Sequence, residues 1–73
     1  MTLYPFRGTY RLTPRARKER EIIFYAPSRS SAFDNLLRVV REEAGTDGVP
    51  GFVDPLTCQQ AHARGVPLYV ENA

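Results

Sequence analysis

The chain is 73 residues long, enough for one small domain, and it contains four tyrosines, four phenylalanines and a single cysteine. A hydrophobic content of 42% argues against a disordered protein. One cysteine excludes a disulfide scaffold, and no apolar run approaches the ~20 residues of a membrane span, so we expect a cytoplasmic protein without membrane contact. At this size folding buries only about 60% of the unfolded surface, which leaves little room for a substrate pocket.

Positive charge is concentrated in the first twenty residues. They contain one acidic residue, Glu19, and six basic ones, which are Arg7, Arg11, Arg15, Arg17, Lys18 and Arg20. Residues 21–73 hold four basic and seven acidic residues, so the net +2 of the chain divides into +5 and −3. Such a split is typical of a protein whose basic part contacts an anionic partner, either a nucleic acid or an acidic protein surface.

Residues 1–7 are expected to form an extended segment ahead of a single domain at residues 8–73, because Pro5 restricts the backbone around it. The large apolar side chains of this segment are Leu3, Tyr4 and Phe6. They either fold back to complete the core or form an exposed aromatic hook for a partner. Aromatic and arginine side chains dominate the energetics of protein interfaces, which favours a partner-binding role for this segment together with Arg7.

Residues 8–12 alternate between polar and apolar side chains, as half-buried strands do. Thr13-Pro14 interrupts the alternation, and residues 15–18 (Arg-Ala-Arg-Lys) form a basic connection to a second strand at residues 19–26. The centre of this second strand is apolar on both faces, which predicts a position in the middle of the sheet. The two strands are expected to form a hairpin with basic side chains at its tip.

The clearest predicted element is an amphipathic helix at residues 32–44. Ser31 and Asp34 have the spacing of a capping box, and Gly45 stands where a helix stop belongs. The face predicted to be buried consists of Phe33, Leu36, Leu37, Val40 and Ala44. Truncation of Leu37 to alanine is therefore expected to destabilise the domain.

Asp54-Pro55 is typical of a helix start, so a short helix is predicted at residues 56–64 with Gly65 as its stop. Alternation at residues 66–71 predicts a last strand, at an edge because Pro67 has no amide hydrogen. Together these elements predict an α+β fold: a small antiparallel β-sheet in the order strand, strand, long helix, short helix, strand, with the long helix packed on one face.

Cys58 and His62 lie four residues apart on the predicted short helix and therefore share a face. A zinc site needs three or four ligands and the chain has no further cysteine or histidine, while a nucleophile–base pair also needs an orienting group. Gly45, Gly48 and Gly51 follow a helix rather than precede one, so they do not predict a phosphate-binding loop. No catalytic residue, metal site or cofactor is predicted, and we expect a protein that is not an enzyme.

The basic run of the first twenty residues contains five arginines, whose planar guanidinium groups suit phosphate and carboxylate partners. It fits three interpretations: a solvated loop, a contact with an acidic protein surface, or a contact with a phosphate backbone. The remainder of the chain is net acidic, which makes nucleic acid the secondary alternative.

Three features occur together in this chain: the extended start Leu3-Tyr4-Pro5-Phe6-Arg7, the basic residues 15–18 and a single capped helix. In this combination the chain resembles small phage-encoded inhibitors of host bacterial RNA polymerase, and it is similar in type to the small anti-CRISPR proteins. The first resemblance implies a protein that docks on an RNA polymerase subunit and blocks initiation, for example by displacing the σ factor. It implies no role for an individual residue.

The sequence thus predicts a non-enzymatic regulator that binds a host protein complex, with RNA polymerase as the first candidate, and that inhibits or redirects transcription initiation. The predicted contact surface combines the first segment with the hairpin and consists of Leu3, Tyr4, Phe6, Arg7, Arg11, Arg15, Arg17, Lys18 and Arg20. Two alternatives stay open: a nucleic-acid-binding accessory domain that uses the basic hairpin, and an anti-CRISPR-like inhibitor of another host complex.

Overall fold

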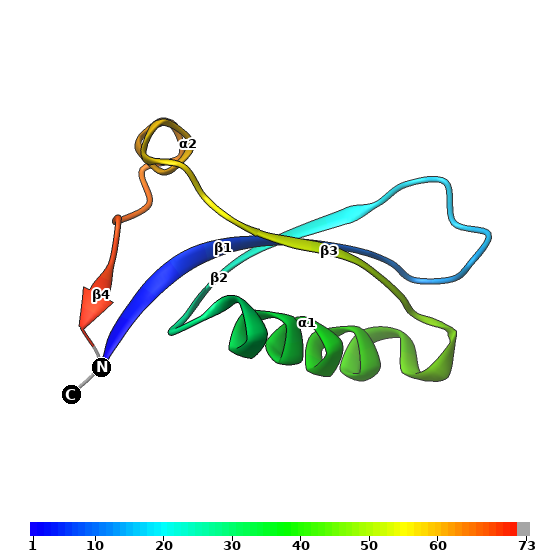
Figure 1. Cartoon of the computed structure of the whole chain (residues 1–73). Coiled ribbons are helices and arrows are strands. Elements are labelled where there is room, and N and C mark those ends of the chain that lie inside the picture. The colour runs from blue at the N-terminus through cyan, green and yellow to red at the C-terminus, as the bar shows by residue number, and fades with distance from the viewer. Residues whose placement is uncertain (72–73) are drawn as a thin grey trace.

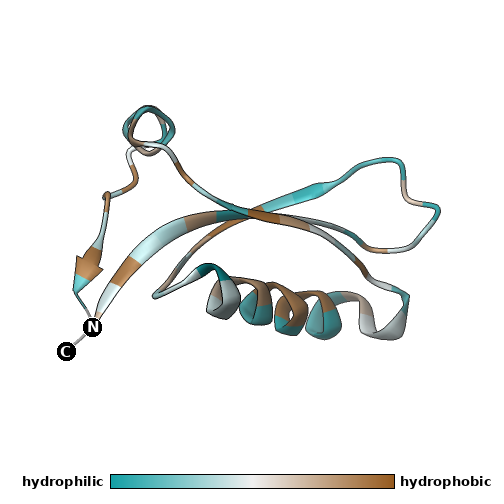
Figure 2. Ribbon diagram, viewed as in Figure 1, coloured by the Kyte–Doolittle hydropathy of each residue, from teal (hydrophilic) through white to brown (hydrophobic). Residues whose placement is uncertain are grey.

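The computed structural model describes residues 1–71 and confirms the predicted α+β class (Figure 1). Its elements in chain order are β1 (Thr2–Arg11), β2 (Arg20–Ala26), α1 (Arg29–Ala44), the 3-10 turn η1 (Gly45–Asp47), β3 (Val49–Pro55), α2 (Cys58–Ala63) and β4 (Val70–Glu71). The strands form an antiparallel sheet, and α1 lies against one face of it. The β1–β2 hairpin is present as predicted, and hydrophilic residues occupy most of its loop (Figure 2).

Strand β1 is the central strand of the sheet. One of its sides pairs with β2, and its other side pairs with β4 at Thr2 and Leu3 and with β3 from Phe6 to Arg11. The prediction that the second strand is central was wrong, because β2 forms an outer edge. The reason is the length of β1, which includes residues 2–7 and so continues through the segment that the sequence predicted to be separate from the sheet.

Pro5 is tolerated in the central strand because its nitrogen, which carries no hydrogen, faces the side of β1 where β3 has ended and β4 has not yet begun. Its carbonyl accepts a hydrogen bond from the amide of Leu56 at 3.1 Å, on the side where β3 has just ended. The N–H and C=O groups of one strand residue point to the same side, so the nitrogen of Pro5 also faces this side and not Tyr25, its partner in β2. The β1–β2 ladder therefore loses no hydrogen bond to the proline.

Helix α1 begins at Arg29, three residues earlier than predicted. Its N-cap is Ser28, whose hydroxyl accepts a hydrogen bond from the amide of Ser31 at 3.2 Å. The predicted capping box of Ser31 and Asp34 was thus wrong, since Ser28, three residues before Ser31, takes the capping role. The predicted stop is confirmed: Gly45 has a φ of 60° and follows the last helical residue.

The buried stripe of α1 is rotated from the predicted face. Its buried positions are Ala32, Leu36 and Val40, of which Leu36 and Val40 were predicted, whereas Phe33 and Leu37 remain 40% and 41% exposed. The prediction that Leu37 belongs to the core was therefore wrong. The small side chain of Ala32 lets the helix approach the sheet closely, and the core that results consists of Phe6, Tyr10, Ala26, Ala32, Leu36, Val40 and Val53.

Residues 56–69 leave the sheet between β3 and β4, and α2 lies within them. The helix starts after Thr57, which forms a capping box with Gln60, and not after Asp54-Pro55 as predicted. Those two residues stay in β3, where they pair with Arg7 and Phe6 of β1. Gly65 adopts a φ of 66° just beyond the helix, where a helix stop was predicted. The last strand was predicted at residues 66–71, but it is limited to Val70–Glu71, which form β4.

Candidate functional site

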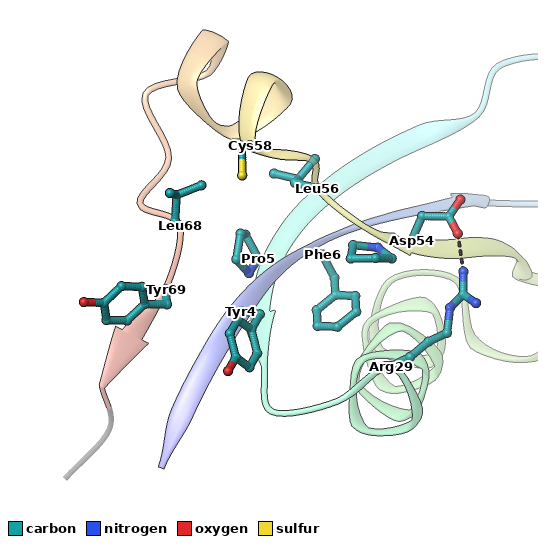
Figure 3. Close-up of a pocket in the computed structure, with 10 residues that line it drawn as sticks. Tyr4, Pro5, Phe6, Arg29, Asp54, Leu56, Cys58, Leu68 and Tyr69 are labelled. Carbon is teal, nitrogen blue, oxygen red and sulfur yellow. Dashed lines mark hydrogen bonds and ion pairs between the residues drawn. The ribbon is translucent and has the colours of Figure 1, made fainter.

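A groove with a volume of about 920 Å³ opens at the end of the sheet where the chain leaves β3 and later returns as β4 (Figure 3). It is lined by Tyr4, Pro5, Phe6, Arg29, Asp54, Pro55, Leu56, Cys58, Leu68 and Tyr69. Most of these side chains are aliphatic or aromatic, and the charged ones belong to a single ion pair. A groove of this composition is suited to an apolar group and offers charged contacts at one end.

Strand β1 supplies the inner wall of the groove. Phe6 is only 5% exposed and belongs to the core, which settles its role between the two alternatives drawn from the sequence: it completes the core. Tyr4, two residues earlier on the same face of the strand, is 48% exposed. Leu3 is half-buried and pairs with Val70 of β4. Of the three apolar side chains predicted to contact a partner, Tyr4 is thus the one most accessible.

The outer wall comes from residues 56–69. Leu68 and Tyr69 are 52% and 59% exposed and both line the groove. In Figure 3, Leu68 lies across the groove from Pro5, whereas the ring of Tyr69 points away from Tyr4. The hydroxyl of Tyr25 in β2 donates a hydrogen bond to the carbonyl of Pro67 at 2.8 Å, which fixes the chain just before these two residues. We call the exposed apolar side chains Tyr4, Leu68 and Tyr69 the apolar rim.

Large exposed apolar side chains gather at this end of the molecule. Besides the apolar rim they include Met1, which precedes the short β1–β4 pairing, and Val70, which is part of it; their exposed fractions are 72% and 39%. Single exposed apolar residues are common on protein surfaces, whereas a contiguous group beside a groove is typical of an interaction site. The groove is therefore the candidate binding site.

An exposed ion pair closes the other end of the groove. The guanidinium of Arg29, the first residue of α1, pairs with the carboxylate of Asp54 in β3. The Nε of Arg29 also donates a hydrogen bond to the carbonyl of Val53 at 3.1 Å, which holds the guanidinium in place. These groups offer a bound molecule a polar contact in a fixed position. The guanidinium is not a free charge for that molecule, because it already pairs with Asp54 and Val53.

The basic hairpin tip lies far from the groove. Arg15, Arg17 and Lys18 are exposed in the loop after β1, at the opposite end of a molecule that is 36 Å in its longest dimension (Figures 1 and 2). We call these three residues the basic tip. Nearer the sheet, Arg11 donates to the carbonyl of Pro14, and Arg20 lies 3.7 Å from the carboxylate of Glu43. The predicted contact surface is therefore divided between the two ends of the sheet.

Arg7 forms interactions within the chain on the sheet face opposite α1. Its Nε donates to Glu21 of β2 at 2.5 Å, and its guanidinium lies 5.2 Å from the ring centre of Phe52. Arg64, just after α2, donates to the other oxygen of the same carboxylate. Glu21 thus joins the outer wall of the groove to the sheet through Arg64.

The pKa of Glu21 lies below its ordinary value of 4.5, mainly because Arg64 donates a hydrogen bond to its carboxylate and also because Arg7 does so. A carboxylate with a lowered pKa in the folded state stabilises the fold above its ordinary pKa, and this contribution is lost as the pH falls through the folded value. We expect thermal stability to fall in this acidic range for the wild-type protein. Glu21→Gln should be less stable at neutral pH and should show a smaller loss on acidification.

Melting temperatures recorded by circular dichroism from pH 7 to about pH 3 test this expectation. Glu42→Gln is the matched control, because Glu42 is exposed on α1 and lies outside this cluster. Equal acid sensitivity of the wild type and Glu21→Gln would contradict the role given to Glu21.

Cys58 carries a free, exposed thiol that points into the groove (Figure 3), and His62 is exposed one turn later on α2. Within residues 1–71 no three His, Cys, Asp or Glu side chains form a group that could hold a metal ion. No helix in this part of the chain has the length and apolar character needed to cross a membrane.

Sequence reasoning identified Tyr4 and Phe6 but missed the rest of the groove. The contributions of Leu56, Leu68 and Tyr69 depend on how residues 56–69 fold back onto β1. The alternating pattern at residues 66–71 instead predicted that Leu68 and Tyr69 belong to an edge strand, but only Val70 and Glu71 form β4. A comparison with known protein families, curated proteins and solved structures found no match to this chain.

Proposed function

We propose that this chain is a non-catalytic protein-binding domain that receives an apolar side chain of its partner in the groove. The observation that carries the proposal is the position of the apolar rim, since Tyr4, Leu68 and Tyr69 are exposed directly around the groove. Aromatic anchors set in or around an apolar pocket are the usual centres of binding energy at protein interfaces. The basic tip then contacts an acidic part of the same partner and speeds association.

A protein partner is favoured over a nucleic acid by the placement of the acidic side chains. Arg7 and Arg20, two of the six basic residues of the predicted patch, pair with Glu21 and Glu43. These carboxylates would repel a phosphate backbone that followed the hairpin towards the sheet. The charge left for a partner is concentrated at the basic tip, which suits a local acidic contact.

Bacterial RNA polymerase is the first partner to test, because of the resemblance to small phage-encoded inhibitors of that enzyme. On this proposal the protein docks on a polymerase subunit and inhibits or redirects transcription initiation in the host cytoplasm. An anti-CRISPR-like inhibitor would use the same groove on another host complex.

A pull-down from bacterial lysate with the tagged protein, with and without nuclease treatment, tests the class of partner. We expect a protein captured in stoichiometric amount in both samples and identified by mass spectrometry as RNA polymerase subunits. Loss of all captured material after nuclease treatment would instead favour the nucleic-acid-binding alternative.

Variants of the two ends should then separate their roles. We expect Leu68→Ser with Tyr69→Ser to weaken partner binding by at least about tenfold, mainly through faster dissociation, because both side chains are interface anchors in this proposal. Both are more than half exposed, so the fold should tolerate the change. Alanine at all three positions of the basic tip should instead slow association and reduce its salt dependence.

Binding kinetics by surface plasmon resonance at two salt concentrations measure both effects. Arg38→Ala with Arg41→Ala is a matched control, since these arginines are exposed on the outer side of α1, away from both ends. Full affinity of the serine variant would rule out the groove as the contact.

A further inference from the structure

The two outer edges of the sheet differ in their capacity to accept another strand. The edge of β3 is closed, because Pro50 and Pro55 have no amide hydrogen and the carbonyl of Val53 already accepts a hydrogen bond from Arg29. Prolines and covering side chains of this kind are the usual means by which proteins protect an edge. The edge of β2 has no proline between Arg20 and Ala26.

The unpaired backbone groups of β2 follow from the hydrogen bond of Pro5. Its carbonyl faces β3, so odd-numbered residues of β1 direct their backbone groups to that side and even-numbered residues direct theirs to β2. The partners of these even-numbered residues in β2 are also even-numbered. The odd-numbered residues Glu21, Ile23 and Tyr25 therefore direct their N–H and C=O groups away from the sheet. No other segment of residues 1–71 pairs with this edge.

Apolar side chains accompany these open backbone groups. Ile22, Ile23, Phe24 and Tyr25 form an uninterrupted run that is only half-buried. Helix α1 contacts β3 more extensively than β2, which leaves the side chains of β2 partly uncovered on the helix face. An unprotected apolar edge strand pairs readily with another strand.

We propose that β2 pairs with β2 of a second copy of this chain, in an antiparallel arrangement centred on Ile23. A twofold axis perpendicular to the sheet relates the copies, and it places both α1 helices on the same face. Ile23 then lies opposite Ile23, and Glu21 lies opposite Tyr25 of the second copy. Every outward N–H and C=O group of the two strands finds a partner in this register.

The edge of β2 is self-complementary, which identifies the second copy as its occupant. On the helix face the register places Ile22 opposite Phe24 and Arg20 opposite Ala26, so apolar side chains meet and no like charges face each other. The same axis also permits registers centred on Ile22 or on Phe24. These would place Tyr25 opposite Glu19, or Glu21 opposite Pro27, and both of these opposing residues lie outside β2. The register centred on Ile23 is thus the most fully paired.

The dimer leaves the groove and the basic tip uncovered and so is independent of the proposed function. Because the strands run in opposite directions, the basic tip of one copy extends past the Ala26 end of β2 in the other. That end lies beside Tyr4, which pairs with Ala26. A partner could therefore contact the groove of one copy and the tip of the other.

Sedimentation velocity over about a 100-fold range of protein concentration tests the dimer by mass action. We expect the wild type to shift from monomer to dimer as the concentration rises. Ile23→Pro should remain monomeric while keeping its far-UV spectrum, because it removes an outward N–H that β1 does not use. Ile23→Lys is the second variant, since it places two like charges opposite each other without changing the backbone. Leu37→Lys, on exposed α1 surface, is the control that should still dimerise.

Amide hydrogen exchange followed residue by residue gives an independent measurement. The amides of Glu21, Ile23 and Tyr25 should exchange more slowly as the concentration rises, whereas those of Ile22 and Phe24, which bond to β1, should be protected throughout. A monomer at every concentration would overturn the proposal and leave this edge to a strand of another protein. A dimer that persists in both Ile23 variants would overturn it by locating the interface elsewhere.

Discussion

Leu36→Ala is expected to destabilise the domain by roughly 3–5 kcal/mol, the upper range for a buried leucine. Leu36 has no exposed surface and is the largest fully buried side chain among the described residues. It packs directly over the backbone of Gly8 in the central strand, where a Cβ atom would approach its Cδ1 to 3.2 Å. A domain of this size has a total stability of about 3–5 kcal/mol, so the variant should be largely unfolded at room temperature.

Urea denaturation followed by circular dichroism measures this effect, with Leu37→Ala as the matched control. The two leucines are neighbours on α1, but Leu37 is 41% exposed. Its truncation should cost about 1 kcal/mol or less. Equal losses for the two variants would show that the buried face of α1 is not centred on Leu36.

Gly51→Ala should have the second largest effect, a loss of roughly 1–3 kcal/mol through overpacking. The pairing of β1 with β3 shifts between Gly8 and Tyr10, and Gly51 lies at this irregularity. A Cβ atom on Gly51 would lie 2.9 Å from the carbonyl oxygen and 3.2 Å from the carbonyl carbon of Thr9. The backbone of the central strand cannot yield as a flexible side chain could, so β3 would have to move outwards.

Gly65→Ala provides the comparison for this prediction. Gly65 has a φ of 66°, but a Cβ atom there would meet no atom within 4 Å. Its substitution should cost about 1 kcal/mol from backbone strain alone. Urea denaturation of both variants separates crowding from strain, and a Gly51→Ala protein as stable as the wild type would contradict the close approach to Thr9.

The helix and the hairpin could be predicted from the sequence because their signals are local. Gly45 stops α1 as predicted, and the alternating residues 8–12 with the apolar residues 19–26 formed paired strands. The length of β1 could not be predicted, because Pro5 is a strand breaker unless its nitrogen faces a gap. That gap exists only because β3 ends at Pro55, fifty residues along the chain.

The choice of buried helix face was also beyond the sequence pattern. Leu36 and Val40 were predicted to be buried, and they are, but Phe33 and Leu37 also follow helical spacing and their large apolar side chains led to the same prediction for them. Close contact with the sheet instead buries Ala32, because Ala32 and Gly8 are small enough for the helix and the strand to approach. The buried face is therefore set by how closely the helix can pack on the sheet, and the hydrophobicity of each side chain alone does not predict it.

The candidate site also has one part that the sequence predicts and another part that it does not. Tyr4 could be recognised from residue type alone, and so could the basic tip. The outer wall of the groove could not, because Leu68 and Tyr69 are brought to Tyr4 by contacts such as the hydrogen bond from Tyr25 to Pro67. Contacts between positions so far apart in the chain leave no periodic signal in either segment.

Strands β3 and β4 lie in line along the same side of β1, so residues 56–69 amount to an insertion into one edge strand. The scaffold on either side is complete without them, and the free energy of closing such a loop changes only slowly with its length. Descendants of this chain could therefore exchange, lengthen or shorten this segment while keeping the sheet and α1. The recognition surface could evolve at little cost to folding, much as variable loops do on a constant framework.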